Sequence, residues 1–212
     1  MNVQEVITRV KRQFGDESGV QITDLDVFRW INDAQNDIAQ AQEILETTAV
    51  TNSVAGQGSY PIPDDIINLR AVHYKGFKLK VVSMQDYDIY VNNWQGDPNN
   101  PEQGTPEIFY VWATEIKMFP VPVESGDEIK LYFSQFPAPI NSVGDALTLP
   151  IKYHNRIVEY CLQQAYELDE NFEASNLKAS QMSSSLTQMA EDASWTEHAH
   201  YPMVTVLPED AW

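Results

Sequence analysis

Two pairs of carboxylates are the side chains whose spacing best suits general acid–base chemistry. Asp64 and Asp65 are adjacent, and Asp86 and Asp88 lie two residues apart. A hydrolase built on such a pair needs one carboxyl group desolvated in a cleft, which raises its pKa towards neutrality. Each pair stands where a helix or turn is expected to begin, and exposed carboxylates commonly cap backbone amides there. Solvated caps are therefore the favoured interpretation, and a hydrolase is the alternative.

Two glycine-containing stretches are also similar in composition to ligand-binding loops. GQGS at 56–59 is followed by neither a helix nor a lysine, so it predicts a hairpin turn and not a phosphate loop. DPNNPEQG at 97–104 partly matches a calcium loop, but Pro101 and Gln103 occupy positions that need an oxygen ligand and a glycine. The sequence contains no G-x-S-x-G and no H-E-x-x-H motif.

The remaining reactive side chains do not form a convincing site. Cys161 is the only cysteine and lies in an apolar helical pattern, which favours a buried core thiol over a nucleophile. Glu197, His198 and His200 have metal-ligand spacing, but without a supporting second shell they favour adventitious binding. We therefore expect no catalytic residue, no metal site and no cofactor.

Composition limits the classes of partner. The chain has 212 residues, of which 43% are hydrophobic, and 31 acidic against 13 basic side chains give a net charge of −18. A chain this acidic is not expected to hold DNA, because binding requires clustered Lys and Arg to release counterions. No apolar run approaches the roughly 18 residues of a membrane span, and the N-terminus is amphipathic from the start. We expect a soluble protein, made in the cytoplasm, that does not bind membranes.

Helices are predicted at the start of the chain. Residues 2–14 have helical apolar spacing and end before Gly15. In TDLDVFRWINDAQNDIAQ, Thr23 or Asp24 can cap a second helix, with Asp26 in its first turn. The polar side chains of this helix fall mostly on the solvent side: Asp33, Asn36, Asp37 and Gln40.

Short strands are predicted from residue 47 onward. IINLRAVHY and FKLKVV flank Lys75-Gly76 and predict a hairpin, and EIFYVWA and EIKMFP predict another around Thr114. SMQDYDIYVNNW predicts a short helix capped by Ser83. DEIKLYFSQFP predicts a strand with one apolar face, formed by Ile129, Leu131 and Phe133.

The overall pattern predicts an α+β fold in which N- and C-terminal helices form a bundle around an inserted antiparallel β lobe, a small sandwich or barrel-like. We expect helices at 1–46, the β lobe at 47–149, a helical hairpin at 150–197 and an extended tail at 198–212. The last helix has a face rich in small residues that needs a neighbour: Phe172, Ala179, Met182, Leu186 and Met189.

Aromatic and apolar residues gather in the tail, where terminal residues are usually frayed. A β-prone MVTVL run and a closing tryptophan favour a segment that becomes ordered on a partner, by strand addition or pocket insertion. The alternative is a disordered tail without a partner. The residues concerned are Trp195, Tyr201, Met203, Val204, Val206, Leu207 and Trp212.

Several pieces, taken in order, resemble the head-to-tail adaptor (connector or head-completion) proteins of tailed bacteriophages. They are ITDLDVFRWINDAQNDIA, GSYPIPDDIINLRAVHYKG, TPEIFYVWATEIKMFPVP, a strand ending in FPAP, and LTLPIKYHNRIVEYCLQQAYELDENFEAS. The resemblance spans roughly residues 3–190 and does not extend to the last dozen. It places Phe28, Trp30, Ile31, Ala34 and Ile38 in the central packing helix, Tyr60, Pro61 and Pro63 at the entry to the β lobe, and Tyr153, Ile157 and Tyr160 on the C-terminal helix face.

The resemblance implies a virion protein at the head–tail interface, assembled in the host cytoplasm. It implies a homo-oligomeric ring, usually a dodecamer, that binds the portal protein, extends the channel used for DNA ejection and carries tail tube, hub or nozzle proteins. DNA passes through the ring without specific binding. The C-terminal residues named above would then bind the portal, and the last helix would contact the next subunit. A polar loop would face the tail of the phage: Trp94, Asp97, Asn99 and Asn100.

Two other functions stay open. One is another tail-completion component of a phage. The other is a monomeric β-lobe binding module that recognises a peptide or glycan through Trp94, Trp112 and the 92–105 loop.

Overall fold

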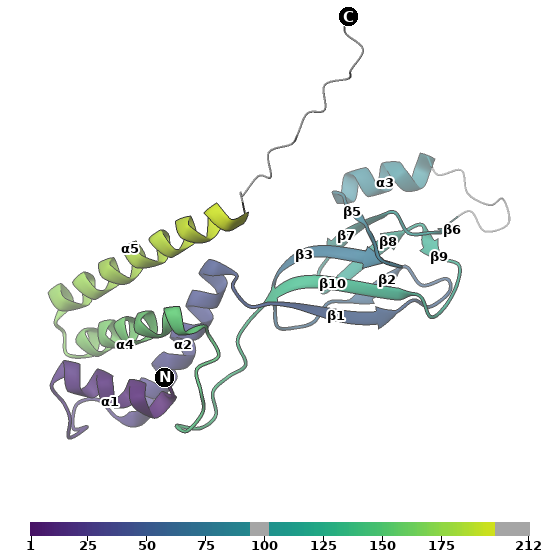
Figure 1. Cartoon of the computed structure of the whole chain (residues 1–212). Coiled ribbons are helices and arrows are strands. Elements are labelled where there is room, and N and C mark those ends of the chain that lie inside the picture. Colours follow the sequence, from purple (N-terminus) through teal and green to yellow (C-terminus); the bar gives the residue numbers. More distant parts are fainter. Residues whose placement is uncertain (94–101, 198–212) are drawn as a thin grey trace, which may run out of the picture. The chain divides into compact units, whose positions relative to one another are not determined.

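The computed structural model describes residues 1–93 and 102–197, and the chain divides into two units (Figure 1). Unit 1 contains Met1–Ala34 and Ile140–Trp212, and unit 2 contains Gln35–Pro139. Helices make up most of unit 1 and paired strands most of unit 2, so the predicted α+β class is confirmed. The division into four segments stays a prediction.

Local sequence signals set the ends of the first two helices. Helix α1 spans Val3–Phe14, with Asn2 and Glu5 forming a reciprocal capping box and Gly15 ending the helix at φ 94°. Helix α2 spans Asp24–Gln42. The Asp26 amide donates to the Thr23 hydroxyl, and the Thr23 amide donates to the Asp26 carboxylate. Both predicted helix starts are therefore confirmed.

The loop between α1 and α2 is organised by one carboxylate. Asp16 is buried and accepts hydrogen bonds from the amides of Val20, Gln21 and Ile22 at 3.0, 2.7 and 2.8 Å, and from the Ser18 hydroxyl. These donors, that of Ile22 foremost, lower the pKa of Asp16 to about 2, against a smaller opposing effect of desolvation. The charged form of Asp16 thus holds the loop that places Ile22 in the core.

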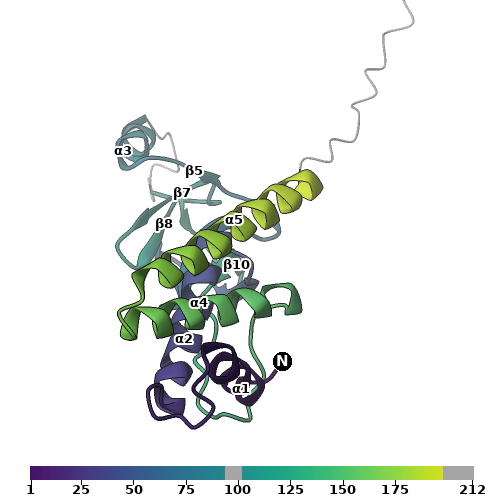
Figure 2. The ribbon, with the colours of Figure 1, turned by 90° about the vertical axis from the view of Figure 1, so that its left-hand side faces the viewer.

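In unit 1, the described residues from 151 onward are mostly helical. Where the chain re-enters the unit, the Asn32 side-chain oxygen accepts a hydrogen bond from the Ile140 amide at 2.9 Å. A short 3₁₀ helix η1, Ile151–Tyr153, precedes α4, His154–Leu168, and α5, Phe172–Glu197. Helices α4 and α5 lie side by side (Figures 1 and 2). Apolar side chains of α1, α4 and the start of α2 are fully buried: Val3, Val6, Ile7, Val10, Val27, Ile31, Ile157, Cys161 and Ala165.

Unit 2 consists mainly of two four-stranded sheets. One has the order β1 (Glu46–Asn52), β10 (Glu128–Gln135), β3 (Ile66–Tyr74) and β4 (Phe77–Lys78). The other has the order β2 (Ser59–Pro61), β8 (Glu115–Phe119), β7 (Ile108–Trp112) and β5 (Lys80–Val81). A separate parallel pair joins β6 (Gln103–Gly104) to β9 (Val121–Pro122). Over residues 1–93 and 102–197 the sheets do not close into a barrel.

Two local predictions for the β lobe were wrong. FKLKVV does not form one hairpin strand, because Leu79 is buried in the core and the chain crosses there from β4 in one sheet to β5 in the other. GQGS at 56–59 is not a hairpin turn, because β1 and β2 belong to different sheets. In both places a crossing between sheets replaces the local pairing that short-range sequence signals favour. The Lys75-Gly76 turn between β3 and β4, with φ of 50° and 82°, is confirmed.

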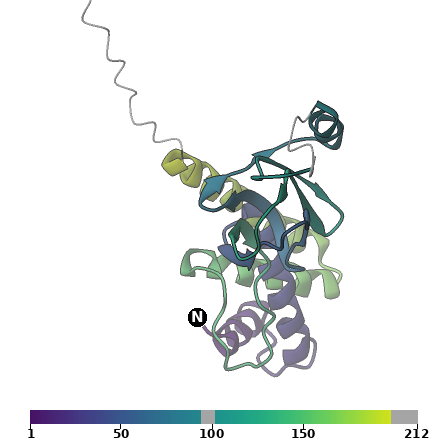
Figure 3. The ribbon, with the colours of Figure 1, turned by 90° about the vertical axis from the view of Figure 1, so that its right-hand side faces the viewer.

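The core of unit 2 lies between the sheets. Ile129, Leu131 and Phe133 of β10 point into it, which confirms the predicted face. Helix α3 (Met84–Asn93) packs on β7 on the side away from this core, and its Tyr87 ring lies 4.5 Å from that of Tyr110. Figure 3 shows the ribbon of unit 2 from another side. Ser83 caps α3 by accepting from the Asp86 amide at 3.1 Å, as predicted.

Replacing Asp16 by Asn tests the role of its charge. We expect Asp16→Asn to lower the thermal unfolding midpoint at pH 7, because an amide nitrogen replaces one of two acceptor oxygens facing backbone donors. The folded pKa lies below the unfolded value of about 3.8, so this stabilisation is present above pH 4 and is lost as the pH falls towards 2.

The unfolding midpoint should therefore differ between wild type and Asp16→Asn at pH 7, and the difference should shrink towards pH 2. The control is Asp37→Asn, on an exposed part of α2. An equal effect of the two substitutions at pH 7 would contradict the assigned role of Asp16.

Candidate functional site

The two carboxylate pairs lie in solvent. Asp64, Asp65, Asp86 and Asp88 are all exposed. At the start of α3 the Asp86 carboxylate accepts a hydrogen bond from the hydroxyl of the capping residue Ser83, so it supports the helix cap. General acid catalysis needs a carboxyl group removed from water, and neither pair provides this in unit 2. The arrangement therefore favours the capping interpretation over a hydrolase.

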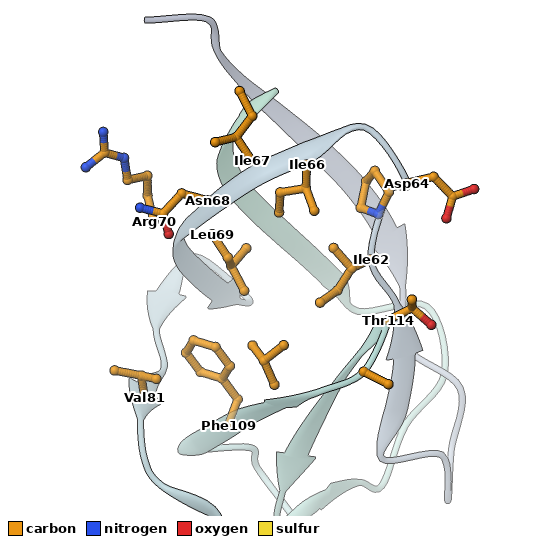
Figure 4. A pocket seen from close by; sticks show the side chains of 13 residues that line it. Ile62, Asp64, Ile66, Ile67, Asn68, Leu69, Arg70, Val81, Phe109 and Thr114 are labelled. Carbon is orange, nitrogen blue, oxygen red and sulfur yellow. The ribbon is translucent and has the colours of Figure 1, made fainter. Parts of the chain in front are cut away.

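An apolar groove of about 440 Å³ opens between β3 and β7 (Figure 4). Ile66, Leu69 and Phe109 point into it, whereas the Asp64 carboxylate and the Arg70 guanidinium point away. The Arg70 guanidinium lies 2.8 Å from the Glu43 carboxylate. The groove can therefore bind an apolar side chain, but it holds no acid or base that could perform catalysis.

The groove exists because the strands at this edge are short. β4 pairs only with His73 and Tyr74 of β3, and β5 pairs only with Ile108 and Phe109 of β7. Among residues 1–93 and 102–197, no strand consequently pairs on this side with the first half of β3 or the second half of β7. Val81 and Val111 at the groove are exposed as a result.

Helix α5 presents the predicted contact face. Met182 is buried, Ala179, Leu186 and Met189 are half-buried, and Phe172 is 63% exposed. Between residues 172 and 190, only Ser175 and Met182 of this helix are buried. Apart from Phe172, this face belongs to the more buried side of α5, and its role between subunits stays a prediction.

Several predicted contact residues cannot be placed. Residues 94–101, with Trp94, Asp97, Asn99 and Asn100, lie outside the described residues. So do His198, His200 and the tail residues Tyr201, Met203, Val204, Val206, Leu207 and Trp212. Trp195 and Glu197 belong to the last turns of α5.

The described ranges give little support to a metal site, a membrane-spanning helix or a reactive thiol. No group of three or more His, Cys, Asp or Glu in residues 1–93 and 102–197 could hold a metal ion. Within the same ranges, no helix is both long and apolar enough to cross a bilayer. Cys161 is fully buried on α4, and this burial raises the pKa of its thiol far above the usual value.

Sequence reasoning missed the residues that line the groove. They come from separate segments, and each is an ordinary strand residue in its own context. Phe28 and Trp30, assigned to the packing helix, are only half-buried. The shortness of FKLKVV could have indicated the groove. After the chain crosses between sheets at Leu79, this segment is too short to pair along the full length of both β3 and β7.

Comparison with known protein families finds a match over most of the chain. The model of the SU10 adaptor protein family matches residues 1–205 of the chain. The match extends over both units and into the tail. A comparison with curated proteins finds no match.

The burial of Cys161 predicts how its thiol reacts. At neutral pH we expect no alkylation in the folded protein, because the thiol is protonated and inaccessible to solvent. Labelling with iodoacetamide, followed by mass spectrometry over a urea series, should track global unfolding.

A suitable comparison is Leu177→Cys, which places a second thiol at a 57% exposed position of α5. That thiol should react in the absence of urea. Rapid labelling of Cys161 without urea would instead support a reactive role.

Proposed function

Because the chain belongs to the SU10 adaptor protein family of phage head-to-tail adaptors, we propose that it forms a ring beneath the portal of the virion. The ring contains twelve copies, as in proteins that the sequence resembles. It extends the DNA channel and carries the tail tube, hub or nozzle proteins. The chain is then a structural protein of the virion, assembled in the host cytoplasm.

The exposed length of α5 carries this proposal. A helix in water usually buries one apolar stripe, and its stability comes mainly from that packing. In α5 the stripe is only partly covered, and large apolar side chains such as Phe172 and Leu177 are 63% and 57% exposed. A neighbouring copy in a ring would cover this surface, with contacts at Phe172, Ala179, Met182, Leu186 and Met189.

Charge supports a passive DNA channel. With a net charge of −18, the ring repels the phosphate backbone and does not retain the DNA during ejection.

Contacts with the portal and the tail use segments of different composition. The apolar and aromatic C-terminal residues, Trp195 and 201–212, bind the portal, since a β-prone strand and a large aromatic ring suit strand addition and pocket insertion. The polar loop containing Trp94, Asp97, Asn99 and Asn100 faces tail proteins.

Sedimentation with the portal ring of the same phage tests the docking. The full chain should co-sediment to a saturating stoichiometry. A version that ends at Ser194 should lose at least about tenfold in affinity, or about 1.4 kcal/mol, because the portal-binding residues are removed. Matching circular dichroism spectra would establish that truncation leaves the fold intact. A full chain that stays monomeric and does not bind contradicts portal docking.

A charge placed on α5 tests the subunit contact. Met189→Glu should block ring formation on the portal, because it buries a carboxylate in an apolar interface. The isolated chain should lose little stability, because Met189 is only half-buried there. The matched control is Gln188→Glu, which adds the same charge at an exposed neighbouring position. Electron microscopy of portal complexes should show rings for the control and none for Met189→Glu; rings for both would contradict the contact.

A further inference from the structure

A row of basic side chains crosses the outer face of one sheet in unit 2. Lys130 on β10 is opposite His73 on β3, and His73 is opposite Lys78 on β4. Their strand neighbours Leu131, Val72 and Leu79 are buried, so the row points away from the core. Lys78, His73 and Lys130 are called the lysine row below.

The lysine row has no charge partner within the sheet. No carboxylate of the described ranges forms an ion pair with Lys78 or Lys130. The position opposite Lys130 on β1 is Val50, which is exposed. Basic side chains on neighbouring strands without a carboxylate between them weaken a sheet slightly. The sequence contains 31 acidic side chains, yet none of those described pairs with these lysines. The arrangement therefore indicates a partner outside unit 2.

An aromatic ring and a hollow accompany the lysine row. The Lys130 ammonium lies 5.1 Å from the centre of the Tyr132 ring, and the His73 ring lies 4.8 Å from it. Tyr132 is opposite Thr48 and Ala71, whose small side chains leave a hollow of about 580 Å³. Glu46 lies at the far end of the hollow, and Glu128 lies on β10 at the other end of the face. The middle of the face is therefore cationic and partly apolar.

The turn between α4 and α5 in unit 1 has the opposite character. Four carboxylates are exposed within seven residues, Glu167, Asp169, Glu170 and Glu173, and none has an ion-pair partner in the described ranges. Two large apolar side chains of the turn are also exposed, Leu168 by 58% and Phe172 by 63%. We call residues 167–173 the acidic turn.

The backbone holds the acidic turn in a defined shape. The Asn171 amide donates to the Tyr166 carbonyl at 2.9 Å, and the Ser175 hydroxyl donates to the Glu167 carboxylate at 3.0 Å. Glu170 has φ 57°, a conformation that is unfavourable for a residue with a side chain and is usually occupied by glycine. A charged residue is thus present at a position where local geometry favours glycine.

We propose that the acidic turn of one copy docks on the lysine row of a second copy. The carboxylates form ion pairs with Lys78 and Lys130. The side chains of Phe172 and Leu168 pack against Tyr132 and Val50 and fill the hollow beside them. Because each chain has both surfaces, the contact is head-to-tail and can repeat around a ring. This inference rests on the proposed ring and specifies which surfaces join its subunits.

Cross-linking of the free full-length chain tests the contact without the portal. Equal amounts of ¹⁵N-labelled and unlabelled protein are mixed at high concentration and treated with a carbodiimide, which joins lysines to carboxylates. We expect mixed-isotope peptides that link Lys78 or Lys130 to residues 167–173. Peptides of a single isotope alone would mean that the two surfaces meet within one chain, and would overturn the proposal.

Charge reversal then tests the contact in the ring. Lys78→Glu/Lys130→Glu and Glu170→Lys/Glu173→Lys should each lower ring occupancy on the portal at least about tenfold, and the two pairs together should restore it. Lys117→Glu/Lys152→Glu has the same change in charge as the lysine-row variant and should have no effect. Unchanged rings in both reversed variants would overturn the proposal and leave portal docking intact.

The two claims can fail separately. Mixed-isotope cross-links in a chain that does not bind the portal would support this contact and contradict the proposed function. Absence of these cross-links both in the free chain and on the portal would overturn the contact alone. Retention of double-stranded DNA by wild type, lost in Lys78→Glu/Lys130→Glu, would assign the lysine row to nucleic acid and overturn the contact between copies.

Discussion

The register of β10 between β1 and β3 is the constraint on which unit 2 depends. Successive side chains of a strand point to opposite faces, so a slip of one residue would exchange the two faces of β10. In the observed register Ile129, Leu131 and Phe133 fill the core, while Lys130 and Tyr132 face outward. The same alternation therefore creates the core of the β lobe and the cationic face that we assign to a neighbouring copy.

Unit 1 combines a well-packed core with a long helix, α5, of which only Ser175 and Met182 are buried between residues 172 and 190. Side chains of α1 and α4 are buried completely, and Asp16 and Asn32 hold the connecting segments by hydrogen bonds to backbone amides. Helix α5 contributes few buried residues to that core. A division of this kind suits an assembly subunit, because one part of the chain provides stability while another keeps apolar surface for a partner.

Charged residues in this adaptor have structural and interfacial roles. Asp16 orders a loop, and Asp26 accepts from the Thr23 amide at the start of α2. Asp86 accepts from the hydroxyl of the capping residue Ser83, and Asp127 accepts from the Tyr74 hydroxyl and pairs with Lys75 at 2.9 Å. Burial and the hydrogen bond to Asp127 raise the pKa of Tyr74 to about 12, so the phenol stays protonated and continues to donate. In the proposed ring, the acidity of the chain would have a different role, because it would discourage adhesion to DNA.

The sequence by itself determined the ends of α1 and the start of α2, the Lys75-Gly76 turn, the β7–β8 hairpin and the inward face of β10. These features depend on caps, turn residues and periodicity, which act over a few residues. Only the tertiary structure decided the crossing at Leu79, the apolar groove and the lysine row. Lys78 and Lys130 are 52 positions apart, so they share a face only because β3 pairs with both β4 and β10. Strand pairing at long sequence separation depends on burial of the whole core, which no local pattern encodes.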